Sequence, residues 1–144
     1  MGCIFWWHDL LQMPKMSEVW HREDMADELT ELQEARGFVS RWSEYSDVAY
    51  TYTRARWSGH GSIQNPLGFW AYLWGLLYMF PKYSSRWLFY RCAGKKMRPP
   101  VFLTEVRNPQ KIEKLHKIAE KYQIDPVRFE EICRQQLRYW LLLP

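Results

Sequence analysis

The fold class is decided by residues 112–141, IEKLHKIAEKYQIDPVRFEEICRQQLRYWL. Apolar residues recur there at helical spacing in two successive runs, which predicts two amphipathic helices. The first stripe consists of Ile112, Leu115, Ile118, Ala119 and Tyr122, and the second of Phe129, Ile132, Cys133, Leu137, Trp140 and Leu141. Because only Gln123-Ile124-Asp125 lies between them, the stretch predicts a C-terminal helical hairpin.

The residues before this stretch are also predicted to be helical. Residues 24–57 form one periodic element with a kink or break at Gly37, and residues 66–80 form a second helix that ends near Pro81. A shorter helix follows from Ser84 to Ala93 and stops at Gly94, while residues 101–106 are extended or form a short strand. The fold class is therefore all-α, a compact bundle of about five or six helices that includes the hairpin.

Three helix starts share one local chemistry. Asn65-Pro66, Asn108-Pro109 and Asp125-Pro126 each place a capping side chain before a proline. The Asn or Asp oxygen accepts a hydrogen bond from a free backbone N–H, and proline fits the first helical position. Each pair predicts the start of a helix.

The chain has 144 residues, enough for one domain with its own core. We expect an N-terminal lead over residues 1–24, either a short helix or disordered, and a single helical domain over residues 25–144. The net charge is −6 over residues 1–34, +8 over 35–110 and +2 over 111–144. The surface field is therefore asymmetric, with an acidic beginning and a basic middle.

Two features of the composition bear on function. Aromatic residues make up 17% of the chain and include nine Trp, more than a core of this size requires. The cysteines Cys3, Cys92 and Cys133 are odd in number and far apart, which predicts reduced thiols and a cytoplasmic protein.

Motifs for catalysis are missing from the sequence. His8, His21, His60 and His116 are isolated, without CxxC or HExxH spacing, and are expected to be surface or capping residues. Ser58, His60 and Ser62 share one flexible loop, which does not build a catalytic triad. No glycine-rich phosphate loop is present. We therefore expect a protein that is not an enzyme and that uses no cofactor or metal.

The strongest functional signal is the mixing of basic and aromatic residues. Cations can follow a phosphate backbone while aromatic rings stack on bases, so these residues predict non-specific, salt-sensitive binding of a nucleic acid, with a single strand as the expected form. The candidate residues are Arg54, Arg56, Trp57, Lys82, Arg86, Trp87, Arg91, Lys95, Lys96 and Arg98. The alternative for the rings is an ordinary amphipathic helix with its aromatic side chains in the core.

The last predicted helix also carries residue types found in readers of DNA sequence. Its outward residues are Arg128, Glu131, Arg134, Gln135 and Arg138. Arg and Gln can recognise base edges in a major groove. Since Glu130 and Glu131 would lie beside the phosphates, we interpret the pair as a structural hairpin in preference to a sequence reader.

A membrane role is the rival interpretation. Residues 66–80, PLGFWAYLWGLLYMF, carry no charge. As a helix they span roughly 22 Å, less than the ~30 Å hydrocarbon core, so we expect a buried core helix. The alternative is a small membrane-associated subunit that uses this segment, with its Trp and Tyr at the interface.

In length, helix content, aromatic richness and basic character the chain resembles the small helical subunit of multi-subunit CRISPR effector complexes, a component of antiviral defence. Some members of that family are made from an internal start, for which Met25 is a candidate here. The family has no diagnostic catalytic motif, so no residue role is carried over. The resemblance implies a subunit that contacts neighbouring protein subunits, stacks with copies of itself and holds a DNA or RNA strand on its basic face.

Overall fold

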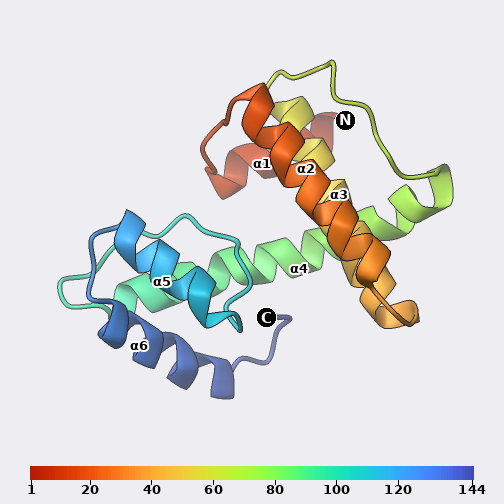
Figure 1. Ribbon diagram of the computed structural model, residues 1–144. Coiled ribbons are helices and arrows are strands. Elements are labelled where there is room, and N and C mark those ends of the chain that lie inside the picture. The colour runs from red at the N-terminus through yellow and green to blue at the C-terminus, as the bar shows by residue number, and fades with distance from the viewer. The chain divides into compact units, whose positions relative to one another are not determined.

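The computed structural model describes all residues, 1–144, and contains six helices and no strand, so the all-α prediction is confirmed (Figure 1). The chain forms two compact units, Met1–Phe80 and Pro81–Pro144. The predicted division into residues 1–24 and 25–144 stays a prediction. Helix α2 runs across residues 24 and 25, and helix α4 runs across the boundary between the two units.

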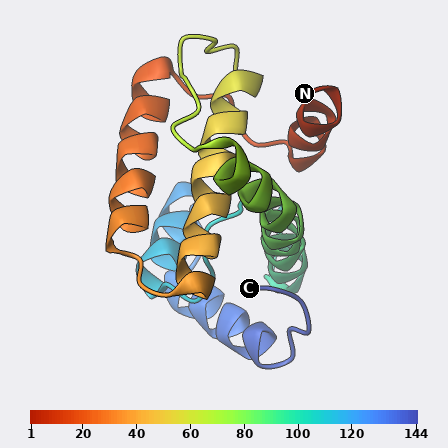
Figure 2. The ribbon, with the colours of Figure 1, turned by 90° about the vertical axis from the view of Figure 1, so that its right-hand side faces the viewer.

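The first unit contains α1 (Gly2–Leu11), α2 (Glu18–Glu34), α3 (Phe38–Trp57) and the beginning of α4 (Phe69–Lys96). Helices α2 and α3 contact each other along their lengths (Figures 1 and 2). The Ser17 Oγ accepts a hydrogen bond from the Trp20 N–H and starts α2. The predicted break at Gly37 is confirmed, since α2 ends at Glu34 and Gly37 takes a positive φ of 84° before α3.

The second unit contains the last part of α4, α5 (Ile112–Lys121) and α6 (Pro126–Arg138). Its core joins all three helices and the extended segment that precedes α5. The fully buried members include Phe89, Tyr90, Leu103, Ile118 and Phe129. The predicted pairing of the last two helices is confirmed, because α5 and α6 pack against each other across a short turn.

Two predicted helix ends are wrong. Helix α4 continues through Pro81, and Ser84 lies inside it instead of capping a new helix. Proline removes the hydrogen bond to the carbonyl four residues earlier, at Leu77. The helix nevertheless continues, and Leu77 lies on its exposed side, with 57% of its surface open to solvent. The helix also passes Gly94 and ends at Lys96.

Of the three predicted caps, one starts a helix and two do not. The Asp125 carboxylate accepts from the N–H groups of Val127 and Arg128 at the first turn of α6. Asn65 and Asn108 accept instead from the N–H two residues later, which closes a turn ahead of the helix. Helices α4 and α5 therefore begin a few residues after those prolines, at Phe69 and Ile112.

The interpretation of residues 66–80 as a buried core helix is wrong for one face. Gly75 and Met79 are buried, but the opposite side of α4 is open to solvent. Its large apolar side chains are Phe69, Trp70, Leu73, Trp74 and Leu77, which we call the α4 apolar face. Helical spacing predicted a helix here, but its burial depended on neighbours that cover only one side.

Candidate nucleic-acid interface

Positive charge is concentrated in the second unit. Residues 81–144 carry fourteen Lys and Arg against six Asp and Glu, a net charge of +8. Residues 1–80 carry six basic and ten acidic residues, a net charge of −4, which together recovers the +4 of the chain. A polyanion is therefore attracted to the second unit and repelled by the first.

The predicted site residues of the first unit are held in internal contacts. Arg54 is 6% exposed, and its Nη2 donates to the Pro14 carbonyl over 2.9 Å while its guanidinium lies 4.9 Å from the Trp20 ring. Arg56 donates from Nη1 to the Gly61 carbonyl, and Trp57 donates from Nε1 to the Asp9 carboxylate. These side chains fix loops, and Arg54 is closed to a phosphate in this structure.

Several predicted cations of the second unit are also covered. Lys82 and Arg86 are 3% and 8% exposed, and the Arg86 Nε donates to the carbonyl of Pro144. The guanidinium of Arg91 lies between two rings, 4.9 Å from Trp87 and 3.6 Å from Phe102. Burial and stacking on protein rings, which the sequence did not reveal, keep these groups from an external partner.

Lys95, Lys96 and Arg98 are the predicted cations that are fully open to solvent. The two lysines lie in the last turn of α4, where the helix dipole favours positive charge. The Arg98 Nη1 donates to the backbone carbonyls of Lys95 and Met97, which places its guanidinium at the end of the helix. Their role in binding stays a prediction, now attached to an accessible cluster.

Further cations that were not among the predicted site residues lie along α5 and at its N-cap. Lys111, Lys114, Lys117 and Lys121 follow one another at spacings of three and four residues, and all but the half-buried Lys114 are exposed. The Lys121 Nζ is already paired with the buried Glu105 at 2.7 Å. This spacing places them along one side of the helix, next to its apolar stripe. The spacing of these lysines is visible in the sequence. It was missed because acidic residues alternate with them and the local net charge is small.

The two acids of α6 are engaged by neighbouring cations. Glu130 pairs with Arg134 and His116 at 2.8 Å each, and Glu131 pairs with Arg128 at 2.8 Å. The hydrogen bond from His116, together with Arg134, lowers the pKa of Glu130. These carboxylates therefore add little repulsion toward a polyanion, and they do not exclude α6 as a DNA reader.

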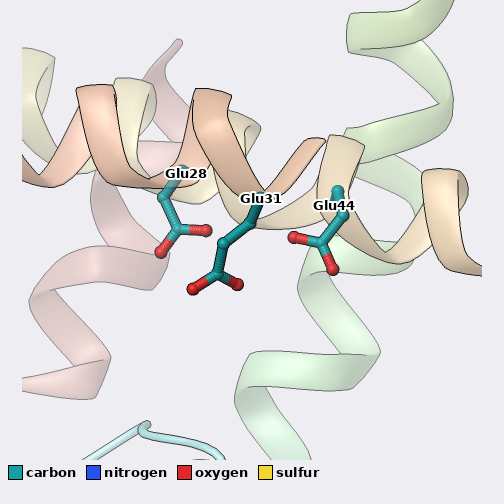
Figure 3. Close-up of side chains that lie close together, drawn as sticks. All are labelled: Glu28, Glu31 and Glu44. Carbon is teal, nitrogen blue, oxygen red and sulfur yellow. The ribbon is translucent and has the colours of Figure 1, made fainter. Parts of the chain in front are cut away.

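The acidic residues of the first unit include one tight cluster. The carboxylates of Glu28 and Glu31 on α2 and Glu44 on α3 offer oxygens within 4.8 Å of one another (Figure 3). Burial, followed by the charges of Asp47 and other acids, raises the pKa of Glu28 to about 8. The raised pKa favours the protonated form of Glu28, and a proton relieves the repulsion that a divalent cation could also relieve.

The expectation of surface or capping histidines is wrong for two of them. His8 and His21 are fully buried, with their Nε2 atoms 3.0 Å from the Thr53 Oγ1 and 3.2 Å from the Ser58 Oγ. Burial and the nearby Arg54 lower the pKa of His8 to about 3 and of His21 to about 4. They are neutral structural side chains.

None of the six helices combines the length and the apolar character that crossing a membrane requires. Comparisons of the chain with protein-family models, with curated proteins and with solved structures found no match.

Proposed function

We propose that the chain is a non-catalytic protein that binds nucleic acid through the exposed cations of its second unit. One observation carries the proposal: fourteen of the twenty Lys and Arg lie in residues 81–144, with net charge +8. Contacts to phosphate dominate the affinity of such surfaces, because each neutralised phosphate releases a counterion. Membership of a larger complex, including the CRISPR type, and stacking with further subunits stay predictions.

The structure narrows the candidate contacts to groups that a phosphate can reach. Lys95, Lys96 and Arg98 are exposed at the end of α4, and on α5 Lys117 is exposed and Lys114 half-buried, whereas Lys121 is paired with Glu105. The rings of Trp57 and Trp87 are partly covered and already contact protein cations, so stacking on bases plays a smaller part than the sequence predicted. The expected binding is therefore mainly electrostatic and weakly dependent on sequence.

A titration at two salt concentrations tests this function. Fluorescence anisotropy with a labelled DNA oligonucleotide, single-stranded and then double-stranded, is measured at about 50 and about 200 mM salt. The double variant Lys95→Ala/Lys96→Ala is expected to bind more weakly. The salt slope is the slope of the logarithm of the binding constant against the logarithm of the salt concentration. On duplex DNA its magnitude should fall by about 2, because each of the two phosphates that lose a cation accounts for about 0.9.

The first unit provides a matched control. Arg36 and Arg41 are also exposed cations of a helical region, and Arg36→Ala/Arg41→Ala removes the same charge from the acidic unit. This variant should leave the salt slope unchanged. An absence of binding at the lower salt concentration, or equal losses of affinity in both double variants, would contradict the proposal.

The α4 apolar face favours a second candidate function, association with a membrane surface. Contiguous exposed apolar side chains of this size mark an interaction site, and Trp and Phe favour the interfacial region of a bilayer. Trp70 and Phe69 are 70% and 73% exposed. The cations that follow in sequence, Lys82 and Arg86, are buried, so these two do not face anionic headgroups.

Co-sedimentation with phosphatidylcholine vesicles tests the second candidate. If it holds, Trp70→Ser/Leu77→Ser should reduce the bound fraction about tenfold or more, because two large apolar side chains leave the interface. Trp6→Ser is the control, since Trp6 is 66% exposed on α1, outside the α4 apolar face. Wild-type protein that stays in the supernatant rules the membrane role out.

A further inference from the structure

The turn between α5 and α6 has a defined hydrogen-bond pattern. The Ile124 N–H donates to the Ala119 carbonyl over 3.0 Å, and the Gln123 N–H donates to the Glu120 carbonyl over 3.1 Å. Gln123 takes a left-handed conformation with φ 53°. These bonds form a Schellman motif that ends α5, and the Asp125 cap starts α6 immediately afterwards. The direction of the chain between the two helices is therefore fixed by local bonds.

Packing holds this pair on a third helix. Ala119, Phe129 and Cys133 are fully buried, and they share one core with Phe89 and Tyr90 of α4. The Gln136 Nε2 also donates to the Phe89 carbonyl over 2.7 Å, which anchors the later turns of α6. The result is a packed three-helix unit in which α5 and α6 are joined by a short turn, a connection shared by helical hairpins and helix-turn-helix proteins.

The remaining side of α6 is uncovered. Its exposed residues, which we call the α6 outer face, are Val127, Arg128, Glu131, Arg134, Gln135 and Arg138. Val127 is 74% exposed at the first turn, and Gln135 and Arg138 make no hydrogen bond or ion pair within the protein. Arg128 and Arg134 are held by ion pairs to Glu131 and Glu130, so Gln135 and Arg138 are the long polar side chains of this face that remain available to a partner.

The residue types on the α6 outer face match the chemistry of base edges. Arg recognises guanine with two hydrogen bonds, Gln recognises adenine in the same way, and an apolar side chain fits the methyl group of thymine. Glu131 can accept from the cytosine amino group. In a helix-turn-helix the first helix crosses the phosphate backbone, and α5 carries lysines that suit this position. The second unit as a whole has a net charge of +8.

We propose that α5, the turn and α6 form a helix-turn-helix that binds duplex DNA with α6 in the major groove, where the α6 outer face selects the sequence. The proposal rests on the proposed function, because it takes the basic second unit as a nucleic-acid binder, and it names the ligand as duplex DNA. Lys114 and Lys117 of α5 contact phosphates, whereas Gln135 and Arg138 contact bases.

Selection from a pool of random duplex DNA, with the full chain as bait at near-physiological salt, tests the proposal. We expect one recurring short sequence, and a labelled duplex carrying it should bind on the order of 100-fold tighter than a scrambled duplex, as two good base contacts provide. Gln135→Ala should remove about tenfold of that preference without changing the salt slope, since the substitution removes no charge. Lys117→Ala should weaken both duplexes equally and lower the slope.

The control is Gln33→Ala, which removes an exposed glutamine from α2 in the first unit and should change nothing. Two outcomes separate the two proposals. If DNA binds with a normal salt slope but selection yields no sequence, or Gln135→Ala acts like the control, the helix-turn-helix inference fails and the proposed function stands. If no nucleic acid binds at the lower salt concentration, both fail.

Discussion

Gly94→Ala is expected to lower the free energy of unfolding by about 3 kcal/mol, the upper end of what overpacking costs. A Cβ at this position would lie 2.2 Å from the Val101 carbonyl oxygen and 3.1 Å from the Leu103 Cγ. Val101 cannot move freely, because its N–H donates to the Gly94 carbonyl and its side chain packs against the core of the second unit. Helix α4 and the segment after it must therefore separate or distort.

Urea unfolding followed by circular dichroism measures this loss of stability, and Gly68→Ala is its matched control. Gly68 lies in the connection before α4, has no atom within 4 Å of an added Cβ, and its φ is outside the left-handed region. Its replacement should change stability by no more than about 0.5 kcal/mol. A Gly94→Ala protein as stable as this control would show that the helix and the segment at Val101 are not in close contact in solution.

Acid is expected to destabilise the first unit through its buried histidines. The pKa of His8 is about 3 in the folded protein and 6.5 in the unfolded chain, so the unfolded chain binds the extra proton between these values. The stability that neutral His8 contributes is therefore complete above pH 6.5 and falls as the pH is lowered. At pH 4 the loss from His8 alone is roughly 3 kcal/mol, and His21 acts in the same direction.

His8→Phe isolates this effect. Phenylalanine keeps the aromatic contacts to Trp7, Tyr50 and Trp57, and the Thr53 hydroxyl still donates to the Tyr50 carbonyl. The variant should match the wild type closely near pH 7 and unfold at higher urea concentration than the wild type at pH 4. His116→Asn removes an exposed histidine that pairs with Glu130, so it should show no gain in stability over the wild type at pH 4. Parallel curves for His8→Phe and the wild type would contradict the assignment of a buried neutral His8.

Local chemistry in the sequence was sufficient for much of the fold. Stripes of apolar residues predicted the helices, and the break at Gly37 and the cap at Asp125 were predicted at the positions where they occur. The errors at Pro81 and Gly94 have one cause. Proline and glycine weaken a helix by a few kcal/mol at most, and burial of the flanking residues can outweigh that cost.

The candidate interface was predictable only in part. Lys95, Lys96 and Arg98 follow a glycine and precede two prolines, so their exposure agreed with the sequence. The sequence around Arg54 looks like that around an exposed arginine. Its side chain nevertheless donates a hydrogen bond to the carbonyl of Pro14, which is 40 residues away. A contact at that separation leaves no periodic signal.

The sequence by itself determined that the protein is helical, where most helices lie, and that its charge is unevenly distributed, because helix propensity, capping and apolar spacing act between residues a few positions apart. Only the tertiary structure decided which cations and which rings meet solvent. Long side chains of Lys and Arg can turn their charged ends to water or lay them on rings and carbonyls, and distant residues select between these positions. The same packing left the α4 apolar face and the α6 outer face uncovered.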